Sequence, residues 1–415
     1  MRVLLCTLPQ KTHFLTMAPL AWALRTAGHE VRVASLPQFS ATITQAGLTA
    51  APVGRAVDVD RLDTDEEREE FRRGLPRPYH LAEEPTGPVG WADVEEDYEN
   101  FVTWGFKLHN APLVTELVAM ARHWRPDLVL WEPFTYAGPI AAKACGAAHG
   151  RLLFTADVFG VVHERLRRLA PPRRDPLAGY LRTHAEQFGV DYDDDMVSGQ
   201  FTVDQLPDSL RVGADLHYVP MRYVPYGGPA VVPKWLWTAP ERPRVALTMG
   251  LSATEHFSGY TFSVADVLSA LADLDVEVVA TVAATEQERL GTVPDNARVV
   301  DYVPLHALAP TCTAVVNHGG FGTLSTVALH GVPQLLLPYH FEGPLLAGRL
   351  VAQGAGLALD SGEATGDAVR AGLLRLLGEA SFAERAGALR DEIRALSAPN
   401  EVADQLEALT AKYRP

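Results

Sequence analysis

Apolar residues in this chain alternate between short continuous runs and longer segments with helical spacing. Residues 2–8 have the pattern of a buried strand, and residues 29–36 have it again. Between them, residues 17–28 carry leucines at helical spacing and end at a glycine. A strand, a helix and a strand within so short a segment predict a βαβ unit with parallel strands and a right-handed crossover.

The same alternation continues along the rest of the chain. Strand patterns at 127–133 and 150–156 bracket a helical pattern at 135–146. The second half has five further strand patterns, at 244–250, 276–282, 297–303, 313–317 and 333–339. We therefore predict an α/β fold built from two Rossmann-like domains with parallel sheets.

Residues 222–244 separate the two halves and contain five prolines and two glycines. A segment of this composition resists regular structure, which is typical of an interdomain linker. We predict a first domain in 1–221, a linker in 222–243 and a second domain in 244–395. Trp235 in the linker, like Trp237, is predicted to be a packing residue.

Composition and charge narrow the class of protein. A chain of 415 residues is too long to fold around one ordinary hydrophobic core. Its content of 47% hydrophobic and 21% charged residues indicates a globular protein. A net charge of −15 argues against nucleic acid as a partner, because a phosphate-binding surface needs basic residues. The apolar start, residues 1–10, is too short for a signal segment or a membrane span.

The three cysteines, Cys6, Cys145 and Cys312, are scattered among apolar residues without a C-x-x-C motif. This spacing suggests neither a disulfide framework nor a zinc site. It fits a reducing, cytoplasmic location.

A glycine-rich loop follows the strand pattern at 313–317 and precedes a helical pattern. The loop consists of His318, Gly319, Gly320 and Gly322, with Thr323 after it. A loop between the carboxyl end of a strand and the amino end of a helix collects free N–H groups and the positive end of the helix dipole. The sequence therefore predicts a phosphate site, to which the imidazole and the threonine hydroxyl can add donors.

Two other interpretations of this loop stay open. A tight turn would also require glycines, at positive φ. A dinucleotide fingerprint is nearly matched, because Gly320 and Gly322 are followed by Ser325 and then by Glu342 at about the distance of a ribose carboxylate. The third glycine is missing, so an NAD-binding dehydrogenase is the minor alternative.

Three segments carry a resemblance to a known family. Residues 294–338, "PDNARVVDYVPLHALAPTCTAVVNHGGFGTLSTVALHGVPQLLLP", resemble the donor-binding signature of family-one GT-B glycosyltransferases. Residues 12–35, "THFLTMAPLAWALRTAGHEVRVAS", are similar to the first βα unit of those enzymes. Residues 175–211 resemble the bacterial members that attach deoxysugars to macrolide or aromatic polyketide aglycones. The resemblance implies a GT-B fold with an acceptor-binding first domain, a nucleotide-sugar-binding second domain, and a last helix in 396–415 that packs toward the first.

The resemblance also implies which residues bind the donor. They are Ser252, His318, Gly319, Gly320, Gly322 and Thr323 for the diphosphate, Tyr302 and Val303 for the base, and Glu342 for the sugar. Gly343 stands where enzymes for fully hydroxylated sugars often have glutamine. A sugar hydroxyl that loses its hydrogen-bond partner costs binding free energy. The glycine therefore favours a deoxysugar, which has fewer hydroxyl groups, carried on thymidine diphosphate (dTDP).

His13 is the predicted catalytic base. It follows the first strand pattern, in a loop at the carboxyl edge of the sheet, and histidine can accept a proton near neutral pH. Without the resemblance, a surface-loop histidine is the preferred interpretation. The resemblance assigns the orienting carboxylate to Glu132, where the family usually has aspartate, and an ion pair or a solvated strand end is the alternative.

Other chemistry finds little support in the sequence. The motifs G-x-S-x-G and H-E-x-x-H are missing, and residues 58–60, "DVD", are weak evidence for a metal-bridged diphosphate. We therefore expect metal-independent catalysis without a cofactor, and the resemblance implies inverting transfer of the sugar to an aglycone hydroxyl in antibiotic biosynthesis. A GT-B sugar-nucleotide epimerase and a non-catalytic binding partner are the remaining alternatives, and a P450-like helper protein and a homodimer both stay open.

Aromatic residues at 91, 104 and 106 are candidates for an acceptor pocket or for core packing.

Overall fold

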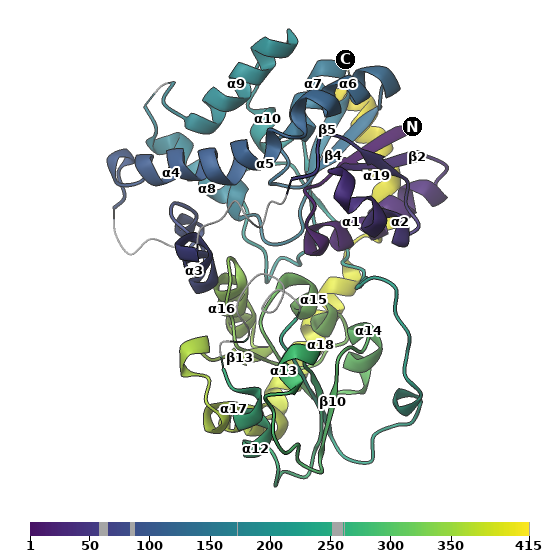
Figure 1. Ribbon diagram of the computed structural model, residues 1–415, viewed down its shortest axis with the longest axis vertical. Helices are drawn as coiled ribbons and strands as arrows, with labels where there is room; N and C mark the ends of the chain where they lie inside the picture. Colours follow the sequence, from purple (N-terminus) through teal and green to yellow (C-terminus); the bar gives the residue numbers. More distant parts are fainter. Residues whose placement is uncertain (58–64, 84–87, 172, 251–259, 261, 415) are drawn as a thin grey trace.

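Two parallel sheets organise the molecule, the first in the upper and the second in the lower part of Figure 1. The computed structural model describes residues 1–57, 65–83, 88–171, 173–250, 260 and 262–414. Ser252 and residues 58–60 lie outside this part of the chain.

The first sheet has the strand order β3-β2-β1-β4-β5-β6-β7 and the second β10-β9-β8-β11-β12-β13. All recorded strand pairs are parallel, as expected for strands joined by crossover helices. The strands of the first sheet are β1 (Arg2–Cys6), β2 (Glu30–Ser35), β3 (Ala50–Pro52), β4 (Leu128–Trp131), β5 (Ala148–Leu152), β6 (Thr202–Asp204) and β7 (Tyr218–Pro220). Those of the second are β8 (Arg244–Thr248), β9 (Glu277–Thr281), β10 (Ala297–Val300), β11 (Ala314–Asn317), β12 (Gln334–Leu336) and β13 (Gly356–Ala358).

Helices cover both faces of both sheets. Those of the first half and the C-terminal helix are α1 (Lys11–Thr26), α2 (Ser40–Gln45), α3 (Asp65–Arg73), α4 (Glu95–Phe101), α5 (Leu108–Asn110), α6 (Val114–Trp124), α7 (Ala137–Cys145), α8 (Val158–Leu169), α9 (Pro176–Phe188), α10 (Asp195–Ser198) and α19 (Pro399–Tyr413). Those of the second half are α12 (Val264–Ala270), α13 (Ala284–Gln287), α14 (Leu305–Leu308), α15 (Phe321–Leu329), α16 (Gly343–Gln353), α17 (Gly366–Gly378) and α18 (Ala380–Ala395). Shorter helical segments are η1 (Pro37–Phe39), η3 (Tyr79–Ala82), η4 (Trp91–Asp93), the π-helix η5 (Val102–Lys107), η6 (Lys234–Trp237), η7 (Ala309–Thr311) and η8 (Ser361–Glu363).

The prediction of an α/β fold with two parallel sheets is confirmed. The predicted strand patterns all overlap strands, although β5 begins two residues before the pattern at 150–156, and the helical pattern at 135–146 contains α7. Strands β3, β6, β7 and β13 were not predicted. Each of these four has three residues, which is too short for an apolar run to stand out from its surroundings.

The C-terminal helix α19 lies in the first half of the molecule, although the second sheet precedes it in the chain (Figure 1). It packs against α1 and β5. Val402 and Leu406 of α19 are fully buried in one apolar cluster with Leu20 and Leu24 of α1. The first sheet therefore receives part of its cover from the last helix of the chain.

Trp235 and Trp237 behave differently in the linker. Arg244 and Arg298 lie over the ring of Trp235, at 5.7 and 5.0 Å from its centroid, so Trp235 packs as predicted. The prediction is wrong for Trp237, which is 72% exposed.

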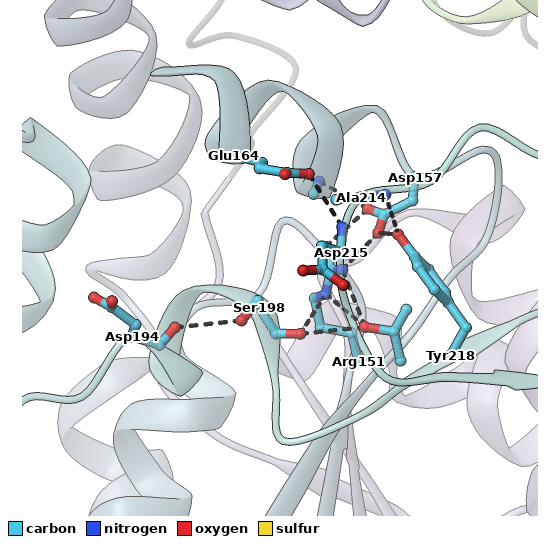
Figure 2. Close-up of polar contacts among 10 residues, drawn as sticks. Arg151, Asp157, Glu164, Asp194, Ser198, Ala214, Asp215 and Tyr218 are labelled. Atoms are coloured by element: carbon cyan, nitrogen blue, oxygen red, sulfur yellow. Dashed lines mark hydrogen bonds and ion pairs between the residues drawn. The ribbon is translucent and has the colours of Figure 1, made fainter. Parts of the chain in front are cut away.

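A buried ion pair anchors the loop between β5 and α8 (Figure 2). Arg151 on β5 is 1% exposed and donates two hydrogen bonds to Asp157, at 2.8 and 2.6 Å. Asp157 caps α8 by accepting from the Gly160 N–H at 2.8 Å, and the Tyr218 hydroxyl donates to it at 2.7 Å. Because the pair is bidentate and hydrogen-bonded at its remaining sites, it fixes both ends of this loop.

Candidate active site

A cavity of about 780 Å³ lies between the two halves of the molecule. It forms at the carboxyl ends of the strands, where open α/β sheets bind ligands. Seven of the predicted site residues line it, namely His13, Tyr302, His318, Gly320, Gly322, Thr323 and Glu342. The fold therefore brings together residues that are more than 300 positions apart in the sequence.

His13 and Glu132 face each other because their strands are neighbours. Strand β1 pairs with β4, so the residues that follow the two strands meet at one edge of the sheet. The His13 Nδ1 atom lies 3.5 Å from Glu132 Oε2, and the two side chains are 15% and 0% exposed. His13 belongs to the first turn of α1 and not to a loop, because α1 already begins at Lys11.

Glu132 is a buried carboxylate with several donors around it. It accepts hydrogen bonds from the backbone N–H groups of Leu8, at 3.2 Å, and Phe134, at 2.9 Å, and from the Thr135 hydroxyl. Burial would raise the pKa of Glu132, but His13 and these donors together lower it below its ordinary value. The side chain is therefore charged at neutral pH and can orient the imidazole.

Two aromatic side chains hold the His13 ring. The ring stacks on Phe154 with centroids 3.6 Å apart and planes 13° apart, and Phe134 lies at 5.8 Å. With Nδ1 directed at Glu132, we assign Nε2 as the nitrogen that is free to accept a proton. Phe134 and Phe154 were not among the predicted residues, although Phe134 directly follows one predicted strand pattern and Phe154 lies near the end of another.

The glycine-rich loop joins β11 to the amino end of α15. Gly319 has φ of +76°, and its N–H donates to Asn317 Oδ1 at 2.8 Å. The buried Asn317 amide donates in turn to Gln334 at 2.9 Å, and Gln334 donates to the Leu324 carbonyl at 3.1 Å. This buried amide pair fixes the loop to α15 and was not predicted, since single polar residues in strand patterns carry no recognisable signal.

Two glycines make room for the ring of His318. A Cβ atom at Gly250 would lie 2.6 Å from the ring, and one at Gly320 would lie 2.3 Å from Nε2. Any larger residue at either position would therefore displace the imidazole. Burial lowers the pKa of His318 to about 4, so the ring is neutral at neutral pH and can offer a hydrogen bond instead of a charge.

Glu342 lies immediately before α16, on the cavity wall facing the first sheet. The Thr155 hydroxyl donates to its Oε1 atom at 2.5 Å. Burial raises the pKa of Glu342 above its ordinary value, and Thr155 and His13 oppose that rise.

The other predicted residues have different surroundings. Tyr302 is 50% exposed and lines the cavity, whereas Val303 is 4% exposed and packs in a core cluster away from the lining. Trp104 lines the cavity and is 54% exposed, but the other two aromatic candidates, Trp91 and Phe106, are buried in the core.

Among the described residues, no group of three or more His, Cys, Asp and Glu is arranged to hold a metal ion. None of the described helices is both long and apolar enough to cross a membrane.

Two family models match almost the entire chain. The N-terminal domain of the erythromycin biosynthesis protein CIII-like family matches residues 22–250, and its C-terminal domain matches residues 265–409.

Relatives of known activity are similar over their full lengths. The 10-deoxymethynolide desosaminyltransferase of Streptomyces venezuelae is 43% identical, over 100% of this chain and 98% of its own. The aklavinone 7-beta-L-rhodosaminyltransferase of Streptomyces galilaeus is also 43% identical, over 100% and 97%. Among solved structures, glycosyltransferase VinC in complex with dTDP has a TM-score of 0.85 at 38% identity, covering 99% of this chain and 100% of that chain.

Proposed function

Since this chain belongs to the erythromycin biosynthesis protein CIII-like family and is a GT-B glycosyltransferase, we propose that it transfers the sugar of a dTDP-deoxysugar to a hydroxyl of a polyketide aglycone. The observation that carries the proposal is that His13, paired with the buried Glu132, lines the same cavity as the glycine-rich loop. An acceptor base and a diphosphate site must share one cavity for sugar transfer.

The proposed reaction is a single displacement. His13 Nε2 removes the proton of the acceptor hydroxyl while that oxygen attacks the anomeric carbon of the sugar. The bond from this carbon to the diphosphate breaks at the same time, so the configuration inverts. Glu132 stabilises the imidazolium that forms, because a charged partner on Nδ1 favours the protonated ring.

The second half of the molecule is proposed to hold the donor. The first turn of α15 directs backbone N–H groups at the diphosphate, and the His318 ring adds a neutral donor. We propose 244–395 as the donor-binding and 1–221 as the acceptor-binding domain, with Ser252, Tyr302 and the backbone of Val303 as further donor contacts. The dTDP complex of VinC and the deoxysugar transferases among the relatives support this donor class.

An apolar aglycone fits the remaining wall of the cavity. Side chains that line it there include Phe71, Phe101, Trp104, Phe134 and Phe341. Aromatic side chains bury much apolar area, so they favour a largely hydrocarbon acceptor over a sugar or a peptide. Of these two 43% identical relatives, one is named for 10-deoxymethynolide and the other for aklavinone, and either aglycone is consistent with this wall.

The experiment that tests the function combines binding with turnover. Calorimetry should show dTDP binding more tightly than uridine diphosphate or NAD, in buffer with a metal chelator. Incubation with a dTDP-deoxysugar and a polyketide aglycone should then yield a glycoside, and His13→Ala should abolish turnover while dTDP still binds. Sugar-nucleotide isomerisation without an acceptor would instead indicate an epimerase, and transfer that stops on chelation would overturn metal independence. A cytoplasmic location stays a prediction, and a P450-like helper and a homodimer stay open.

A further inference from the structure

Thr155 connects the two halves of the molecule at the cavity. It follows β5 of the first sheet and is 2% exposed, and its hydroxyl donates to Glu342 of the second half at 2.5 Å. The hydrogen bond occupies Oε1, which leaves Oε2 as the oxygen available to a ligand. The Thr155 hydroxyl of the first half therefore orients the Glu342 carboxyl group of the second half.

The residues before Glu342 are also bound to the first half. The N–H groups of His340 and Phe341 donate to the carbonyls of Arg72 and Phe71, both at 2.8 Å. These carbonyls belong to the last turn of α3, where a helix has no internal donors for them. The ring of Phe71 also stacks on that of Phe341, with centroids 5.8 Å apart.

Residues 340–342 therefore contact the first half at three consecutive positions. His340 and Phe341 have φ of +67° and +45°, a conformation that is unfavourable for non-glycine residues. Such a conformation persists when surrounding contacts hold it, and α3 and Thr155 supply those contacts.

The loop that carries Thr155 is itself rigid. The buried pair of Arg151 and Asp157 fixes it at both ends (Figure 2). Phe154, the residue before Thr155, stacks on the ring of His13. Two consecutive side chains thus contact the proposed base on one side and the carboxyl group of Glu342 on the other.

We propose that Thr155 is a positioning residue, which holds Glu342 toward the donor sugar and sets its place relative to His13. This inference rests on the proposed function. It assigns part of the donor-sugar selectivity to the acceptor-binding half, since neither Thr155 nor α3 belongs to the half that binds the nucleotide.

The test compares Thr155→Val, which keeps the shape of the side chain and removes the hydroxyl, with Thr155→Ser, which keeps the hydroxyl. Thr410→Val is the matched control, because Thr410 is also buried and its hydroxyl donates to the Leu406 carbonyl on α19. Each variant is assayed for kcat and KM with a dTDP-deoxysugar and for the dissociation constant of dTDP alone.

Thr155→Val should reduce kcat/KM for the dTDP-sugar about tenfold or more, as expected for a lost hydrogen bond to a carboxylate. Its affinity for dTDP should stay unchanged, because dTDP lacks the transferred sugar that Glu342 is proposed to contact. Thr155→Ser should restore most of kcat/KM, and Thr410→Val should match the wild type. The loss of kcat/KM caused by Thr155→Val should also be smaller in a chain that already carries Glu342→Gln, because both substitutions act through the same hydrogen bond.

An unchanged kcat/KM in Thr155→Val would overturn the inference while leaving the proposed function intact. Equal losses of kcat/KM and of dTDP affinity would also overturn it, because they indicate a general structural defect. A wild-type chain that transfers no sugar from any dTDP-sugar would overturn the proposed function first and this inference with it.

Discussion

His13 and Glu132 carry the proposed chemistry, and each can be changed without adding bulk. His13→Gln should lower kcat by about 10²- to 10⁴-fold, the usual contribution of a general base. Glu132→Gln should lower kcat by about 10²-fold or more, because an amide cannot stabilise the imidazolium. Both variants should bind dTDP with wild-type affinity in calorimetry. His123→Gln, an exposed histidine on α6, is the control, and unchanged turnover in His13→Gln would exclude His13 as the base.

Gly320 has a steric role that can be tested separately. Gly320→Ala places a Cβ atom 2.3 Å from His318 Nε2, so the ring must move away from the phosphate site. We expect the dissociation constant of dTDP to rise about tenfold, the effect of one lost hydrogen bond to a charged group. Gly348→Ala on α16 is the control, because a Cβ atom there meets nothing within 4 Å. Equal affinities in the two variants would contradict the assigned role of His318.

Single residues were predictable where they follow a recognisable pattern. His318 belongs to a glycine-rich motif that the sequence shows by itself, whereas His13 as the base and Glu342 as a sugar contact were selected through the resemblance. Phe154 and Thr155 carry no motif, and their roles depend on contacts with residues 141 and 187 positions away, which no local pattern records. Val303 was selected by resemblance, but its side chain packs in the core, so only its backbone can serve the nucleotide.

Several long helices, among them α6, α8 and α9, were not predicted, whereas the strands of four or more residues were, because an apolar run is visible over that length. Buried charges within them were not predicted. Arg151 is the second residue of the predicted strand pattern at 150–156, and nothing local indicates that Asp157 and Thr202 satisfy its guanidinium group.

The ion pair of Arg151 and Asp157 is expected to stabilise β5 and α8 together. Arg151→Met leaves a buried carboxylate without its partner and should lower the free energy of unfolding by about 3 to 5 kcal/mol. Arg167→Met is the control, since Arg167 pairs with Asp194 in an exposed position and should cost no more than about 1 kcal/mol. Urea denaturation measures both, and similar losses in the two variants would contradict the importance of the buried pair.

The stability of the folded chain should depend on pH through Asp204. Burial raises the pKa of this carboxyl group to about 7, and its Oδ2 atom has no hydrogen-bond partner. Because the folded pKa lies above the unfolded one, the contribution of Asp204 to stability is full below about pH 4 and is lost as pH rises through about 7. Asp204→Asn removes this decline, so its stability relative to the wild type should rise by roughly 2 to 3 kcal/mol between pH 5 and 8.

Denaturation at the two pH values measures this difference. Asp208→Asn is the control, because the Asp208 side chain is 83% exposed and should show the same pH dependence as the wild type. A parallel pH dependence of the wild type and Asp204→Asn would show that Asp204 ionises normally in the folded chain.

The position of α19 has a consequence for synthesis on the ribosome. Chains emerge from their amino ends and domains generally fold as units, yet the first domain needs a helix that is made after the entire second domain. Until then the apolar face of α1 around Leu20 and Leu24 lacks its partner and is open to chaperones or to other nascent chains. The amino-terminal half of this protein is thus completed last, and a truncated chain ending at the linker should aggregate where the full chain does not.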